Sequence, residues 1–205
     1  MTHSVFLCIA CNQEVQDGIF TGDFIPTLIK VILPIIILVP LLIIYFKTLK
    51  SGDRSTTQRI PVIMATLTLG IGMGGFVDAI TLHQILQWHQ MLSNQISFTN
   101  FEGKSINMFW DGMFEAVTWI ITMVGITLLW HSRSQPNLQF TNNLFIGGLL
   151  AGWGIFNSMD SIFNHYLFSL HNVKEIDPNP ELWNLGFLIF SFILIIVGWL
   201  IIRKK

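Results

Sequence analysis

Charged residues are scarce in this chain of 205 residues. Asp, Glu, Lys and Arg together make up 11% of it, whereas a soluble domain usually carries about 25%. The formal net charge is −1, so the sequence lacks the basic excess of a nucleic-acid-binding protein. Phosphate-binding loops, dinucleotide fingerprints and Ser-His-Asp motifs are also missing. The length leaves no room for a second, soluble domain.

Long apolar runs make up most of what is present. Hydrophobic residues account for 52% of the chain, and the mean hydropathy is +0.60. A helix needs about 20 mostly apolar residues to cross the hydrocarbon core of a bilayer. Five segments meet this requirement, at about residues 24–46, 60–88, 107–130, 141–170 and 184–202. The sequence therefore predicts an all-α integral membrane protein with five transmembrane helices.

The distribution of Lys and Arg predicts the orientation of these helices, because cytoplasmic loops carry an excess of both. One side of the predicted bundle carries Lys47, Lys50, Arg54, Arg59, Arg133, Arg203, Lys204 and Lys205. The other side carries only Lys30, Lys104 and Lys174. We therefore expect the N-terminus outside and the C-terminus in the cytoplasm, in a bacterial inner membrane.

A pattern of one aspartate and two histidines occurs twice. Asp78, His83 and His89 are followed 82 residues later by Asp160, His165 and His171. The helix after each triad opens with Trp and continues to Val-Gly, at Trp110 and Val124-Gly125 and again at Trp183 and Val197-Gly198. Both copies run in the same direction, which predicts parallel repeats related by an axis along the membrane normal.

This repeat divides the chain into three parts. Residues 1–23 are a polar extracytoplasmic arm, which is not an apolar signal-peptide core. Residues 24–59 are an accessory transmembrane helix and a cytoplasmic loop. Residues 60–205 are a duplicated four-helix membrane domain built from two helical hairpins, a 2+2 parallel repeat.

Carboxylates and imidazoles gather towards the predicted outer ends of three helices. Ionisable groups inside a membrane are costly and usually functional, and His with Asp or Glu is the ligand set of Zn, Fe or Cu. The first candidate ligands are His83, His165 and Glu115. Asp78, Asp111 and Asp160 are further ligands, or partners that hold the imidazoles.

Helix geometry limits what one helix can supply. On a continuous α-helix, Asp78 and His89 would lie about 16 Å apart, and His83 would point roughly 140° away from Asp78. Each helix is therefore expected to provide one or two ligands. His89 and His171 are expected at the outer mouth of the site, where the helices end.

Several functions fit such a cluster. A transition metal ion would indicate a metal-handling or assembly factor, or a membrane enzyme in which Glu115 acts as general base toward bound water. A hydrogen-bonded network without metal, an accessory subunit of a membrane redox complex, and a small transporter are alternatives. Haem between His83 and His165 is another, although the crowded carboxylates argue against an apolar haem pocket. The inner halves of the helices lack a polar path, which argues against transport.

Cys8 and Cys11 form a Cys-Ile-Ala-Cys motif in the N-terminal arm and are the only cysteines. The next residue is Asn12 rather than His, so c-type haem attachment is not indicated. The pair fits a disulfide, a redox pair, or two ligands of a second metal site.

The motifs resemble a known family. Gly75-Phe-Val-Asp78, Phe109-Trp-Asp111-Gly112 and Gly152-Trp-Gly154-Ile-Phe-Asn157, together with the histidines, are similar to the prokaryotic predicted membrane proteins called domain of unknown function 2243. The similarity covers about residues 60–202. It implies a bacterial-type membrane protein and no established activity. The family pattern tends to have His where this chain has Gln90 and Glu115, which leaves the metal preference open.

Overall fold

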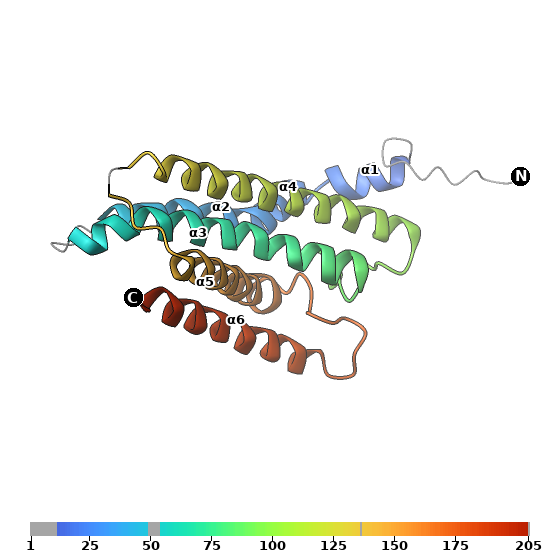
Figure 1. Cartoon of the computed structure of the whole chain (residues 1–205). Coiled ribbons are helices and arrows are strands. Elements are labelled where there is room, and N and C mark those ends of the chain that lie inside the picture. Colours follow the sequence, from blue (N-terminus) through green and yellow to red (C-terminus); the bar gives the residue numbers. More distant parts are fainter. Residues whose placement is uncertain (1–11, 49–53, 136, 205) are drawn as a thin grey trace, which may run out of the picture.

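The chain folds into a bundle of long helices (Figure 1). The computed structural model describes residues 12–48, 54–135 and 137–204, and within these ranges the regular structure is entirely helical. The bundle contains α2 (Phe24–Thr48), α3 (Arg54–Asp78), α4 (Phe101–Ser132), α5 (Asn142–Asp160) and α6 (Pro180–Arg203). α3 packs against α4 and α5, and α6 packs against α5. Cys8 and Cys11 lie outside the described residues.

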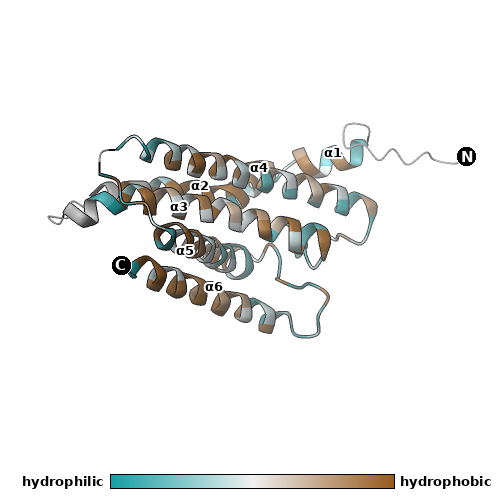
Figure 2. Ribbon diagram, in the orientation of Figure 1, coloured by the Kyte–Doolittle hydropathy of each residue, from teal (hydrophilic) through white to brown (hydrophobic). Residues whose placement is uncertain are grey.

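Four segments are long and apolar enough to cross a membrane, at 24–42, 58–85, 101–132 and 180–203. Figure 2 shows apolar residues along nearly the whole of α6, where Ile189, Ile193 and Ile196 are exposed. These four confirm the predicted apolar helices. α5 is not among them, because three asparagines and four glycines lower its hydropathy. A fifth span stays a prediction.

Glycines bring the helix backbones into direct contact. A Cβ atom on Gly152 of α5 would lie 3.0 Å from both Gly70 Cα and Ile71 N of α3. On the other side of α3, a Cβ on Gly125 of α4 would lie 2.6 Å from Leu69 N. Small residues at such crossings are how membrane helices pack closely. α5 is therefore held in the interior of the bundle.

A short amphipathic helix precedes the bundle and was missing from the sequence prediction, which treated residues 1–23 as a polar arm. α1 (Gln13–Phe20) begins at the N-cap Asn12, whose side-chain oxygen accepts a hydrogen bond from Glu14 N over 3.0 Å. Val15 and Ile19 are buried one helical turn apart, and α1 packs on α4. Eight residues are too few for a strong periodic signal.

Two π-helical segments shape the end of the bundle where α4 and α6 begin. η2 (Ala79–Ile85) follows α3 directly after Asp78, and η3 (Ser161–Leu167) follows α5 directly after Asp160. Two residues after each segment ends, the backbone adopts a left-handed conformation. These residues are Gln87, with φ 50°, and Ser169, with φ 48°. The loops after them turn back toward the bundle instead of continuing outward.

Candidate metal centre

Each π-helical turn brings one aspartate to one histidine. Asp78 Oδ2 lies 3.3 Å from His83 Nε2, and Asp160 Oδ2 lies 3.1 Å from His165 Nε2. A π-helix repeats its hydrogen bonds at i→i+5, which is also the spacing within each pair, so both side chains lie on one face. The expectation that His83 points away from Asp78 was wrong, because it assumed an uninterrupted α-helix.

His89 and His171 are buried in the centre of the cluster, fully enclosed by the protein. Their rings stack, with centroids 4.4 Å apart and planes inclined by 4°. The placement at an outer mouth was therefore wrong. The π-helical segments end at Ile85 and Leu167, and the following loops carry both imidazoles inward.

The two loops exchange hydrogen bonds through these histidines. His89 Nδ1 donates to Val173 O over 2.8 Å, and His171 Nδ1 donates to Met91 O over 3.1 Å. Met91 and Val173 are themselves 82 residues apart. A carbonyl oxygen can only accept, so each Nδ1 carries a proton, and in a neutral ring Nε2 then keeps a free lone pair.

Four imidazoles thus converge from two π-helical segments and two loops. The His83 and His89 ring centroids are 4.4 Å apart, and those of His165 and His171 are 4.9 Å apart. Two sets of three residues each offer donor atoms within 4.8 Å of one another. The first set is His83, His89 and His171, and the second is Asp160, His165 and His171. All are buried, and His171 belongs to both.

Several donor atoms of this cluster lack hydrogen-bond partners within the described part of the chain. They include the Nε2 atoms of His89 and His171 and Oδ1 of Asp78, whereas Nε2 of His83 and of His165 each face one carboxylate oxygen. Most buried polar atoms in proteins are paired, and unpaired ones call for an explanation such as a bound ion. His89 and His171 belong to the two donor sets, and both, like Asp78, are candidate ligands that the sequence indicated.

Asp111 holds the cluster from α4. Its Oδ1 accepts hydrogen bonds from His83 Nδ1 and from Met91 N, each over 2.8 Å. Asn184 of α6 occupies the matching place in the second half, where its Oδ1 accepts from Val173 N over 2.9 Å. The sequence left two roles open for Asp111, that of a metal ligand and that of a partner that orients an imidazole. These contacts fit the second role.

A family model agrees with the resemblance read from the motifs. The model described as predicted membrane protein (DUF2243) matches residues 65–205. The chain belongs to this family. The match includes both π-helical segments and all four clustered histidines of this DUF2243 protein. No curated protein and no solved structure matches it.

The DUF2243 cluster buries three carboxyl groups beside four imidazoles. Asp78, Asp111 and Asp160 are each less than a tenth exposed, and the basic groups that contact them among the described residues are imidazoles. Burial lowers the pKa of His89 well below its ordinary value, and nearby His83 and His171 lower it further. A nearby cation stabilises a buried ionised carboxylate, and protonated imidazoles or a metal ion would supply one here.

Glu115 lies outside both donor sets. It is half-buried on α4, and its carboxylate accepts a hydrogen bond from the side-chain amide of Gln84. Its predicted roles as ligand and general base stay predictions.

Sequence reasoning missed the two carbonyl groups that orient His89 and His171. Met91 and Val173 present them from the backbone, and their apolar side chains give no signal of this role. Asn164, whose amide donates to Asp160 Oδ1 over 2.7 Å, was detectable from its i,i+4 spacing to Asp160.

Proposed function

We propose that this DUF2243 protein is an integral membrane protein that binds a transition metal ion in its His/Asp cluster and serves in metal handling or assembly. The observation that carries the proposal is the convergence of four buried imidazoles, two of which, His89 and His171, have Nε2 atoms without hydrogen-bond partners. Three of the four imidazoles have Nδ1 held by an oxygen. That arrangement fixes the ring and leaves Nε2 for a ligand bond, as in known metal sites.

The donor set indicates the class of metal. Imidazole nitrogens with carboxylate oxygens suit Zn, Fe or Cu(II). Because one nitrogen lone pair binds one ion, His171 cannot complete both donor sets at once. We therefore expect one tightly bound ion per chain, with His171 among its ligands.

An ion fits the cluster better than haem does. A haem with two axial histidines must place its macrocycle between the two rings. The rings of His89 and His171 are already stacked at 4.4 Å, and His83 and His165 lie against the same pair. The carboxylates of Asp78 and Asp160 add charge where an apolar haem pocket would be needed.

The proposal includes five spans and a duplicated hairpin. The first hairpin is α3, η2 and α4, and the second is α5, η3 and α6. Its support is the constant offset of 82 residues between the two π-helical segments, the two left-handed residues and the two exchanged hydrogen bonds. With α5 as the fifth span, the cluster lies at the extracytoplasmic end of an inner-membrane protein with its C-terminus in the cytoplasm.

Elemental analysis of the detergent-purified protein tests the proposal. The protein would be stripped with a chelator, reloaded separately with Zn²⁺, Fe²⁺ or Cu²⁺, desalted and measured by mass spectrometry. The expected result is one ion per chain for at least one metal. The variant His131→Ala, whose exposed histidine lies at the far end of α4, reports non-specific binding and should match the wild type. A content well below one for all three ions overturns the proposal.

The orienting role of Asp111 gives a second prediction. Asp111→Asn is expected to weaken metal binding about 10- to 100-fold, the usual cost of losing an orienting partner. The fold should persist, because an asparagine oxygen can still accept from Met91 N, as Asn184 accepts from Val173 N. A competition titration against a chromophoric chelator measures the affinity. An unchanged affinity would show that Asp111 does not support the site.

A further inference from the structure

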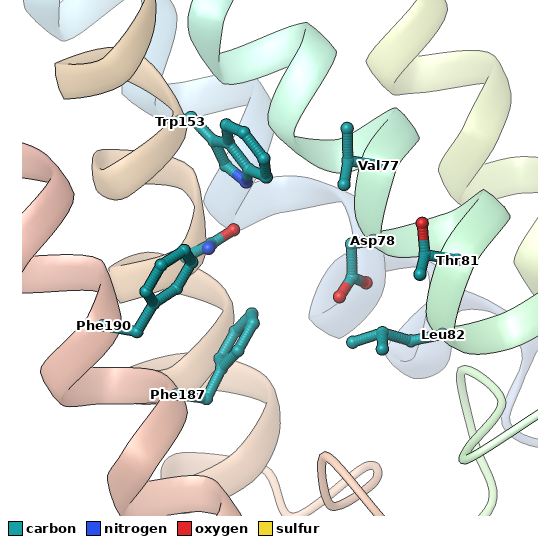
Figure 3. Close-up of a pocket in the computed structure, with 8 residues that line it drawn as sticks. Val77, Asp78, Thr81, Leu82, Trp153, Phe187 and Phe190 are labelled. Carbon is teal, nitrogen blue, oxygen red and sulfur yellow. The ribbon is translucent and has the colours of Figure 1, made fainter. Parts of the chain in front are cut away.

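A pocket of about 160 Å³ lies between α3, α5 and α6 and ends at Asp78 (Figure 3). Trp153, Phe187 and Phe190 form its aromatic side, and Val77 and Leu82 form part of the opposite side. Aromatic walls of this kind favour a flat ring as occupant, through offset or edge-to-face contacts.

Two unpaired acceptors define the polar end of the pocket. Oδ1 of Asp78 and Oδ1 of Asn157 lack hydrogen-bond partners, whereas Asp78 Oδ2 lies 3.3 Å from His83 Nε2. Asp78 is 5% exposed and Asn157 is 1% exposed. Figure 3 shows the Asp78 carboxylate directed into the space in front of the aromatic side chains. Buried acceptors without donors are costly, so the fitting occupant carries a hydrogen-bond donor.

The equivalent place in the other half of the bundle is closed. Val77, Asp78, Thr81 and Leu82 correspond, 82 residues on, to Met159, Asp160, Phe163 and Asn164. The cavity beside that second set is only about 10 Å³, because Pro34 and Ile35 of α2 complete its wall. α2, which has no counterpart in the repeat, thus fills one of two similar openings and leaves the opening at Asp78 free.

The open pocket connects with an apolar surface. An adjoining cavity of about 260 Å³ shares Val77 and Trp153 with it and continues along α3 and α5. The wall of this cavity includes Met73 and Ile146, which are 47% and 50% exposed. In a membrane these side chains face lipid, so an occupant reaches the pocket from the bilayer.

We propose that the pocket binds a lipophilic aromatic alcohol of the phenol or quinol class, which enters between α3, α5 and α6. Its ring lies against Trp153, Phe187 and Phe190, and its single hydroxyl proton is shared between Asp78 and Asn157 in a three-centre hydrogen bond. A lipid acyl chain fills the same volume and leaves both acceptors unpaired, which disfavours it. The inference deepens the proposed function, because it places the hydroxyl beside Asp78 and thus next to the proposed metal ligand His83.

Binding of 1-naphthol to the full chain in lipid nanodiscs tests this proposal, with 1-methoxynaphthalene as the matched probe that has no hydroxyl donor. Naphthol is expected to bind about tenfold more tightly than its ether, the effect of one hydrogen bond of about 1.4 kcal/mol. Fluorescence titration measures both. Equal affinity of the two probes overturns the proposal.

Three variants locate the binding. Val77→Trp fills the pocket and should abolish naphthol binding, whereas Ile193→Trp, on the exposed face of α6 outside the pocket, should leave it unchanged. Asn157→Leu removes one acceptor and should weaken naphthol but not its ether. Asn157→Leu also keeps the test decisive if Val77→Trp fails to fold, since it removes an unpaired buried polar group. Unchanged naphthol affinity in Asn157→Leu overturns the proposal.

Metal content measured on the same samples separates the two proposals. If the chain holds no metal and Val77→Trp still blocks naphthol, the pocket proposal stands and the metal proposal falls. If the chain holds one ion and Val77→Trp folds yet binds naphthol like the wild type, the pocket proposal falls alone.

Discussion

Replacing His171 by alanine should reduce bound metal to the background level, whereas replacing His89 by alanine should leave part of it. His171 belongs to both donor sets, and His89 belongs to one. In His89→Ala the set of Asp160, His165 and His171 remains complete. In His171→Ala each set keeps two donors, which are too few to hold an ion against a chelator. Elemental analysis after desalting measures the difference.

The two variants are matched in their structural cost. Both rings are fully buried, they stack on one another, and each donates one hydrogen bond to a backbone carbonyl of the opposite loop. Their melting temperatures in detergent should therefore fall by similar amounts. A difference in metal content at equal stability reports ligation rather than packing. If His171→Ala keeps the metal content of the wild type, its assignment as the shared ligand is wrong.

Replacing Gly152 by leucine is expected to disrupt the bundle. The first carbon of the new side chain would meet Gly70 Cα and Ile71 N at 3.0 Å, and both are backbone atoms of α3. Backbone cannot rotate aside as a side chain can, so α3 and α5 must separate. Overpacking within a core costs about 1–3 kcal/mol, and a clash with backbone belongs at or above the top of that range. Thermal unfolding followed by tryptophan fluorescence measures the loss.

Gly186→Leu is the matched control, because it adds the same side chain to α6 at a position where a Cβ atom meets nothing within 4 Å. Its melting temperature should stay close to that of the wild type. Equal melting temperatures for the two leucine variants would show that the crossing of α3 and α5 is looser than its glycines indicate.

The helices of this protein were predictable because apolar length alone determines a membrane span. Four predicted segments reappear as apolar helices. α5 was harder to assign as a membrane span from its hydropathy. It is enclosed by α3 and α6, and the glycines that allow this close contact lower its hydropathy. The spacing of 82 residues also indicated the histidines and aspartates that converge in the cluster.

The relative positions of those candidate ligand residues were not predictable. A change from α-helix to π-helix after Asp78 and Asp160 alters which residues share a face, yet no residue type marks where it begins. The inward turn of His89 depends on a loop whose hydrogen bonds involve mainly backbone atoms. Asp111 and Glu115 share one face of α4, but that pattern could not show which of them meets His83 and which meets Gln84.

The hydrogen bonds exchanged between the two loops also constrain how the protein is made. His89 finds its acceptor 84 residues later in the chain, and His171 finds its acceptor 80 residues earlier. A partly synthesised chain that contains only the first hairpin therefore lacks the stacked pair of His89 and His171. Metal binding generally depends on a folded ligand set. If the cluster binds an ion as proposed, a nascent chain would gain that affinity only when the last hairpin docks, and partly synthesised chains would not compete for metal.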